Sequence, residues 1–168
     1  MIKSFDGKTP KVADSAWVSE AAYVIGDVEI GENSCIWPGV VVRGDFASIK
    51  IGRNTQIEDN SVVHSGVPVE IGDNVTVGHS VVVHGMKIGN NCLIGNNATV
   101  LDNAKIGNFC IIGAGCVVSQ GMEIPDNSFV VGVPAEIKGQ VPKERWQQRR
   151  QARGGYVELL KRYKEQGL

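Results

Sequence analysis

Histidine is rare in this sequence, and its three copies lie close together. The chain has 168 residues and three histidines, His64, His79 and His84. Neutral imidazole is a ligand for divalent metals, and three such ligands leave a coordination position open to water. A divalent ion lowers the pKa of that water toward neutrality and so makes hydroxide available as a nucleophile. The three histidines therefore predict a metal site with hydration or hydrolysis chemistry.

A six-residue repeat supplies the elements that must position these side chains. Aliphatic residues recur at every sixth position in four runs, which only three phase breaks separate. The runs are Val24, Ile30, Ile36 and Val42; Ile51, Ile57 and Val63; Ile71, Val77 and Val83; and Ile88, Ile94, Val100, Ile106, Ile112, Val118, Ile124 and Val130. Six residues are too few for a helix pair but suit a short strand and a turn in which Gly, Asn or Asp takes positive φ. We interpret each hexad as one side of a coil.

The repeat resembles the hexapeptide-repeat family over about residues 12 to 135. The resemblance implies a left-handed parallel β-helix in which three hexads form one triangular coil. We therefore expect a mainly β fold, with residues 1–141 as the β-helix domain and residues 142–168 as a C-terminal α-helical appendage packing on it. Pro142 opens the appendage, and Gly154-Gly155 is predicted to divide it into two helical pieces.

Counting hexads back from Val100 places the histidines relative to one another. Arg43, His64 and His84 fall in one column on consecutive coils, and adjacent rungs about 4.8 Å apart let two imidazoles reach one ion. His79 lies on the preceding side, more than about 10 Å around the triangle. A homotrimer would bring His79 of one subunit to the column of the next, so we expect the metal at subunit interfaces.

Charged residues accompany both parts of this arrangement. Asp45 lies beside the histidine column, while Glu58 and Asp59 come one coil before His79. Asp59 falls directly on the column of His79. Arg43 is expected to pair with Asp59 or Asp45 across the interface.

Composition narrows the class of protein. Net charge is −1, which gives no sign of a nucleic-acid partner. The N-terminal run MIKSFDGKTP lacks a basic segment followed by an apolar stretch, and other apolar runs are only a few residues long. We therefore expect a cytoplasmic protein with no membrane partner. The four cysteines show no CxxC pair and are predicted to be reduced core thiols.

Three runs, VVRGDFASIKIG, QIEDNSVVH and VGHSVVVHG, closely resemble the γ-class carbonic anhydrase family, and this resemblance spans essentially the whole chain. It implies reversible hydration of carbon dioxide to bicarbonate, with metal hydroxide as the nucleophile. His64 and His84 of one subunit and His79 of its neighbour would hold the metal. Zinc is the expected ion, although iron or cobalt accepts the same ligands. Arg43 and Asp45 match family residues that tie subunits together and help order the site.

Two further residues are candidates for catalysis through the same resemblance. Glu58 stands before Asp59 where the family usually has glutamine, so an amide that orients a zinc-bound hydroxide is replaced by a potential acid or base. Tyr156 in GGYVE resembles a C-terminal tyrosine that approaches the metal-bound solvent, with plain packing as its alternative role. Phe46 and the segment SGVPVE stand where the founding archaeal-type enzymes carry proton-shuttle glutamates.

Three other functions remain open at this point. The segment VVGVPAEIKG resembles the one that often closes the last coil of hexapeptide acyltransferases, which normally use a single catalytic histidine. The same metal hydroxide could hydrolyse a thioester or another small ester, and activity toward acyl-CoA would discriminate this reaction. A noncatalytic metal-binding scaffold would use the basic C-terminal helix and polar coils as a docking surface.

Overall fold

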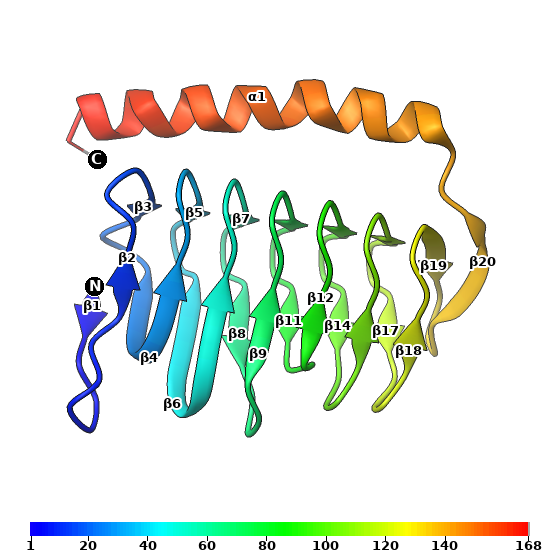
Figure 1. Ribbon diagram of the computed structural model, residues 1–168, viewed down its shortest axis with the longest axis horizontal. Helices are drawn as coiled ribbons and strands as arrows, with labels where there is room; N and C mark the ends of the chain where they lie inside the picture. Colours follow the sequence, from blue (N-terminus) through cyan, green and yellow to red (C-terminus); the bar gives the residue numbers. More distant parts are fainter. Residues whose placement is uncertain (168) are drawn as a thin grey trace.

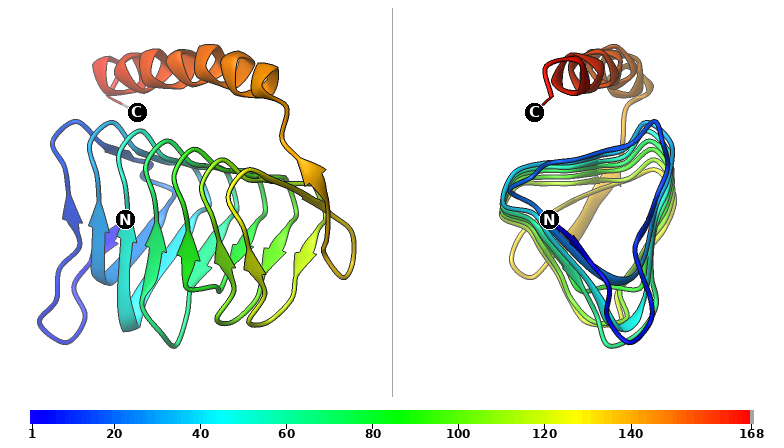
Figure 2. Two further views of the ribbon diagram at one scale, coloured as in Figure 1. Left: turned by 45° about the vertical axis from the view of Figure 1, so that its right-hand side comes forward. Right: turned by 90° about the vertical axis from the view of Figure 1, so that its left-hand side faces the viewer.

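The computed structural model describes the backbone of residues 1–167, and the side chains of this range apart from those of residues 143 and 147–154. The chain winds into a left-handed parallel β-helix of about seven coils, so the predicted fold class is confirmed. Viewed along its axis, the coil is a triangle with three flat walls (Figure 2). Each coil pairs with the next through parallel backbone hydrogen bonds, and one wall carries a long helix (Figure 1).

The first and second walls belong to one sheet because two long strands bend from one wall into the other. The first wall contains β1 (Ile2–Lys3), β4 (Tyr23–Ile30), β6 (Val41–Ile51), β8 (Val62–His64), β11 (Val82–Val83), β14 (Thr99–Val100) and β17 (Val117–Val118). The second wall contains β2 (Lys11–Val12), β9 (Val69–Ile71), β12 (Lys87–Ile88), β15 (Lys105–Ile106) and β18 (Glu123–Ile124), together with the C-terminal parts of β4 and β6.

The third wall forms a separate sheet, and its last strand reverses direction. Its members are β3 (Trp17–Val18), β5 (Cys35–Ile36), β7 (Gln56–Ile57), β10 (Thr76–Val77), β13 (Leu93–Ile94), β16 (Ile111–Ile112), β19 (Ser128–Val131) and β20 (Glu136–Gln140). Only β20 is antiparallel to its neighbour, so it closes the final coil. Covering the end of a solenoid in this way protects its last unpaired edge.

The aliphatic residues of the hexads fill the interior of the triangle. Ile57, Val77, Ile94 and Ile112 are fully buried, and the other members of the repeat are at most 3% exposed. Strand periodicity explains this pattern, since each short strand turns one side chain inward and its neighbour outward. The four cysteines are buried free thiols, as predicted.

Asparagine and glycine shape the corners between the walls. Eight asparagines adopt positive φ, a conformation that this side chain tolerates better than most. They are Asn33, Asn54, Asn60, Asn74, Asn91, Asn97, Asn103 and Asn127. Close approach sets a different requirement at Gly44, where a Cβ atom would lie 2.6 Å from the backbone oxygen of Asp27. The glycine between Arg43 and Asp45 therefore lets adjacent coils pack.

Helix α1 (Lys143–Glu165) returns over the third wall, from the last coil to the first (Figure 1). Leu160 is 3% exposed, and the ring of Tyr163 packs edge-on against Trp17 and Trp37, with centroid separations of 5.1 and 5.3 Å. Lys164 donates through Nζ to the backbone oxygen of Ala16 at 3.1 Å. The C-terminal half of the helix is thus anchored on the first coils.

The predicted break of the appendage into two pieces at Gly154-Gly155 is wrong. A single helix of 23 residues runs through both glycines. Each glycine costs about 1 kcal/mol relative to alanine in a helix interior. Burying one large apolar side chain contributes about 1.5–3 kcal/mol, so the packing of Leu160 and Tyr163 beyond the glycines outweighs that cost.

A membrane-spanning helix would need about 20 predominantly apolar residues. Within residues 1–167, no helix has both the length and the apolar character for such a span.

Candidate metal centre

His64 and His84 lie side by side at the end of the first wall. The pairing of β6 with β8 sets Arg43 opposite His64, and the pairing of β8 with β11 brings His84 onto the following coil. The two imidazole rings have centroids 5.4 Å apart and meet edge to face. This is the stacking that the hexad count predicts. Neighbouring imidazole rings at this separation can each turn one nitrogen toward a shared ion.

The Nε2 atom of His64 is buried and makes no hydrogen bond within the described chain. It lies 3.2 Å from Oδ1 of Asp45, but without hydrogen-bond geometry. Burial lowers the pKa of His64 below its usual value, and the positive charge of Arg43 lowers it further. His64 is therefore neutral near pH 7, and its buried Nε2 has no hydrogen-bond partner among the described residues. A buried polar atom without a hydrogen bond is rare in proteins, so Nε2 of His64 is a candidate for binding another group, such as a metal ion.

Arg43 and Asp45 form an ion pair beside this histidine. Asp45 also accepts a hydrogen bond from the backbone N–H of Phe46 at 3.0 Å. Desolvation acts to raise the pKa of Asp45, but the bonds from Arg43 and the backbone outweigh it and hold this pKa below its usual value. Within one chain Arg43 therefore pairs with Asp45, and the predicted pairing across a subunit interface stays a prediction.

The ring of Phe46 borders the same place. It contacts the imidazole of His64 at a centroid distance of 5.9 Å and is 76% exposed. Phe46 therefore places an exposed apolar surface directly beside His64.

His84 has a partner that the sequence did not reveal. Its Nδ1 lies 2.8 Å from Oδ1 of Asp102, on the next coil. Histidines that hold metals commonly give their second ring nitrogen to a carboxylate in this way. No motif singles out Asp102, and only a count of one coil of eighteen residues beyond His84 could have found it.

His79 stands at the other edge of the first wall, at the corner that follows β10. Its Nδ1 lies 3.1 Å from Oδ2 of Asp59, and its Nε2 lies 3.3 Å from Oε2 of Glu58. The side chain is 52% exposed, more than that of either other histidine. Two carboxylates therefore hold the ring, while one face remains open to a neighbouring molecule.

Glu58 links His79 to helix α1. The hydroxyl of Tyr156 donates to Oε1 of Glu58 at 2.7 Å, and Glu58 is only 6% exposed. The ring of Tyr156 also packs edge-on against Trp37, with centroids 6.2 Å apart. Tyr156 thus packs on the third wall and hydrogen-bonds the buried carboxylate of Glu58, while its predicted approach to metal-bound solvent stays a prediction.

A single chain does not assemble all three histidines. His79 precedes β11 and His84 follows it, so the strand separates them across the first wall. Among residues 1–167, no three His, Cys, Asp or Glu side chains are grouped to hold an ion. A site built from His64, His79 and His84 would therefore need a second copy of the chain.

The outward side chains of the three walls differ in character. The first wall presents a mostly apolar column of stacked residues, Tyr23, Val41, Val62, Val82, Thr99 and Val117. Tyr23 and Val82 are each 37% exposed. An apolar column between the two histidine positions has the composition of a surface that another subunit covers.

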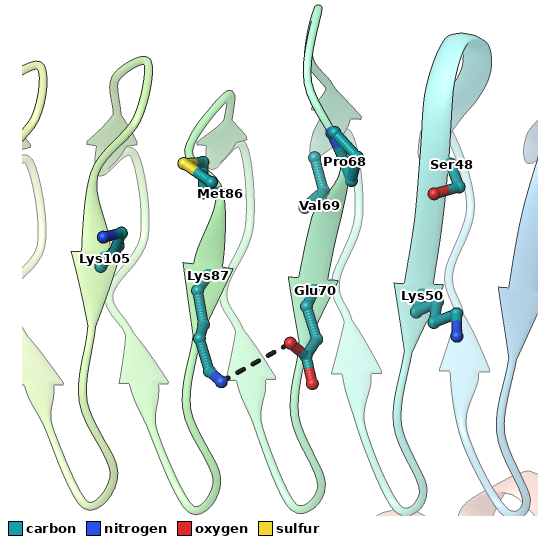
Figure 3. Close-up of a pocket in the computed structure, with 8 residues that line it drawn as sticks. All are labelled: Ser48, Lys50, Pro68, Val69, Glu70, Met86, Lys87 and Lys105. Carbon is teal, nitrogen blue, oxygen red and sulfur yellow. Dashed lines mark ion pairs between the residues drawn. The ribbon is translucent and has the colours of Figure 1, made fainter.

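The second wall presents a charged column instead. Lysine and glutamate stack in the order Lys11, Glu29, Lys50, Glu70, Lys87, Lys105 and Glu123. A shallow groove of about 480 Å³ crosses this column, where Lys87 pairs with Glu70 at 3.6 Å (Figure 3). None of the three histidines lines this groove. The charged wall has the character of a solvent-facing surface.

The chain matches the family model for the bacterial transferase hexapeptide of six repeats at residues 9–44 and 85–120. A carbonic anhydrase from Geobacillus kaustophilus is 45% identical over 64 residues, which cover 38% of this chain. The matched stretch spans 35% of the length of that curated relative.

Two solved structures resemble nearly the whole chain. A putative acetyltransferase from Bacillus cereus has a TM-score of 0.94 and 36% identity, and the match covers 98% of this chain and 96% of the other. A hexapeptide transferase family protein from Anaplasma phagocytophilum has a TM-score of 0.91 and 33% identity, covering 96% and 97%. The repeat, the fold and these likenesses together show that the chain belongs to the hexapeptide-repeat family.

Proposed function

We propose that the chain forms a homotrimer that hydrates carbon dioxide reversibly, with one divalent metal at each subunit interface. Zinc is the first candidate for the ion, and iron or cobalt suits the same ligands. The observation that carries the proposal is the buried Nε2 of His64, which lacks a hydrogen bond and lies beside the ring of His84. The likeness to a protein named carbonic anhydrase supports the choice of reaction.

The residues of the chain fit a metal in three respects. His64 is held neutral by burial and by Arg43, which keeps its lone pair available. His84 and His79 each turn Nδ1 toward a carboxylate, Asp102 and Asp59 respectively. Three neutral imidazoles leave a position open to water, whose lowered pKa would supply the nucleophile.

The apolar outward column supports the trimer. Its residues lie between the edge that carries His79 and the edge that carries His64 and His84. Packing this wall against a neighbouring copy would bury the column and carry His79 of one subunit toward the histidine pair of the next. The same association that removes apolar surface from water would therefore complete the ligand set.

Glu58 is the group that would take up the proton released when water adds to carbon dioxide. Its buried carboxylate is fixed by the hydroxyl of Tyr156 through Oε1, while Oε2 faces His79. The proton would form the new O–H bond on Glu58 and then pass to buffer, which returns Glu58 to its charged form. Phe46 adds an apolar surface beside His64 that suits an uncharged substrate such as carbon dioxide.

Stopped-flow measurement of carbon dioxide hydration tests the proposal, on protein purified without oxygen and with its metal content quantified. Activity should rise in proportion to bound metal in the unaltered chain. His79→Ala should lose both metal and activity, whereas Glu123→Gln on the second wall should retain both. A fully metallated trimer that does not accelerate hydration would overturn the reaction that we propose.

Acyl transfer is the second candidate, since both nearly full-length structural relatives carry transferase names. Transfer to an acceptor, and hydrolysis of the thioester by an activated water, both release free thiol from acetyl-CoA. Thiol release by the protein, measured with and without small amine or sugar acceptors, separates these reactions from hydration. An assay of this kind needs no change in the protein preparation.

A further inference from the structure

Asp102 has a defined position relative to His84. The pairing of β11 with β14 sets Val83 opposite Val100, so the residues after each strand approach one another at the same corner. The backbone N–H of His84 donates to Val100 at 2.9 Å, and the side chains then meet through Nδ1 and Oδ1 at 2.8 Å. Backbone pairing therefore fixes both ends of the contact.

Backbone hydrogen bonds define the turn that carries Asp102. Leu101 and Ala104 close a turn through a 3.2 Å backbone bond, and Asn103 in the turn has a φ of 59°. These values describe a turn with Asp102 at its second position and a left-handed residue at its third. The backbone oxygen of Asp102 also accepts from Gly121 at 2.8 Å, which ties the turn to the following coil.

The chemistry of the pair decides which nitrogen of His84 carries hydrogen. An ionised carboxylate only accepts hydrogen bonds, so the imidazole must be the donor through Nδ1. Nε2 of the neutral ring is then the unprotonated nitrogen. His79 differs, because both of its ring nitrogens face carboxylates, Nδ1 toward Asp59 and Nε2 toward Glu58.

We infer that Asp102 is a positioning residue for His84, holding the ring so that Nε2 serves as the metal ligand. The inference rests on the metal centre of the proposed function and assigns that centre a residue beyond its histidines. Asp102 does not touch the reacting atoms and acts only through His84. Removing a carboxylate of this kind typically weakens metal binding about 10- to 100-fold.

A surface ion pair is the competing account of the same contact. The side chain of Asp102 is 50% exposed and that of His84 is 34% exposed, and exposed pairs contribute little to stability. A pair of that kind would leave metal affinity unchanged when it is removed. Metal affinity and the position of the ring hydrogen therefore separate the two accounts, whereas thermal stability does not.

The test compares Asp102→Ala with Glu123→Ala, which removes an exposed carboxylate paired with Lys105 at 2.8 Å on the second wall. Zinc affinity is measured on the assembled protein by competition with a chromophoric chelator. Nitrogen-15 NMR of the three histidines in metal-free protein reports which ring nitrogen of His84 is protonated. Loss of the Asp102 carboxylate should weaken zinc binding about 10- to 100-fold and should shift His84 toward the form protonated at Nε2.

The outcomes distinguish failure of the positioning role of Asp102 from failure of the proposed hydration reaction. Zinc affinity within twofold of the unaltered chain in Asp102→Ala, with an unchanged His84 signal, would overturn the positioning role while leaving hydration untouched. Weaker binding with a shifted signal, against no change in Glu123→Ala, supports it even when the metallated protein fails to hydrate carbon dioxide. An unaltered chain that binds none of zinc, iron and cobalt would overturn both the inference and the proposed site.

Discussion

Mixing subunits that carry different histidine substitutions tests whether the metal centre is shared between chains. His64→Ala removes one member of the pair that lies within a chain, while His79→Ala removes the residue at the opposite edge of the first wall. Neither variant alone can complete a site. A trimer that contains both can, because a subunit with intact His64 and His84 can face a subunit with intact His79.

The expected yield follows from three-fold symmetry. A hybrid trimer contains two subunits of one variant and one of the other. Only one of its three interfaces then joins a subunit with intact His64 and His84 to a neighbour with intact His79. Hybrids purified through a different affinity tag on each variant should therefore bind about one metal per trimer, roughly a third of the unaltered content. Activity per hybrid trimer should fall to about the same third.

A second pair of variants is the matched control. His64 and His84 would serve the same site from the same subunit, so a hybrid of His64→Ala with His84→Ala has no intact interface. That hybrid should bind no metal at the site. Recovery in this control, or no recovery in the first hybrid despite trimer formation by light scattering, would refute the shared site.

Three further predictions concern the proton acceptor, the helix and a core thiol. Glu58→Gln keeps an oxygen for the hydroxyl of Tyr156 but loses the proton acceptor, so kcat in dilute buffer should fall about 100-fold. The metal content should stay unchanged, and concentrated imidazole buffer should restore the rate. Leu160→Ala should lower the free energy of unfolding by about 2–4 kcal/mol, measured by urea denaturation, because Leu160 is 3% exposed. Burial raises the pKa of Cys35 to about 12, so its thiol stays protonated at pH 8 and should resist iodoacetamide until the protein is unfolded, as peptide mass spectrometry would show.

The fold and the histidine column could be predicted because both follow from a short repeat. Each hexad places one aliphatic side chain inside the triangle, so a count along the sequence is also a count along the axis. Arg43 and His64 fall opposite one another on that count, as the register of β6 and β8 shows. The phase breaks did not disturb the column, although they differ in kind: the first lies within β6, the second lies between β8 and β9, and the third shortens the step from β11 to β12.

Counting hexads along the sequence could not predict contacts that depend on tertiary packing. The helix through Gly154-Gly155 is continuous because its C-terminal half docks on Trp17 and Trp37, and local propensity carries no trace of that docking. Asp102 went unnoticed because no local pattern connects a turn residue with a histidine one coil earlier. The sequence also did not show that Arg43 pairs with Asp45 of its own chain, because that contact depends on side-chain geometry.

The return of α1 to the first coils has a consequence for the order of events during synthesis. Lys164 reaches the backbone oxygen of Ala16 across 148 residues of sequence. Each new coil can wind on the one made before it, because parallel pairing links coils that are close in sequence. The indole rings of Trp17 and Trp37, however, must wait for Tyr156 and Tyr163 to leave the ribosome. The nascent β-helix therefore carries an open aromatic surface until α1 has been synthesised, and Glu58 lacks its tyrosine partner until then.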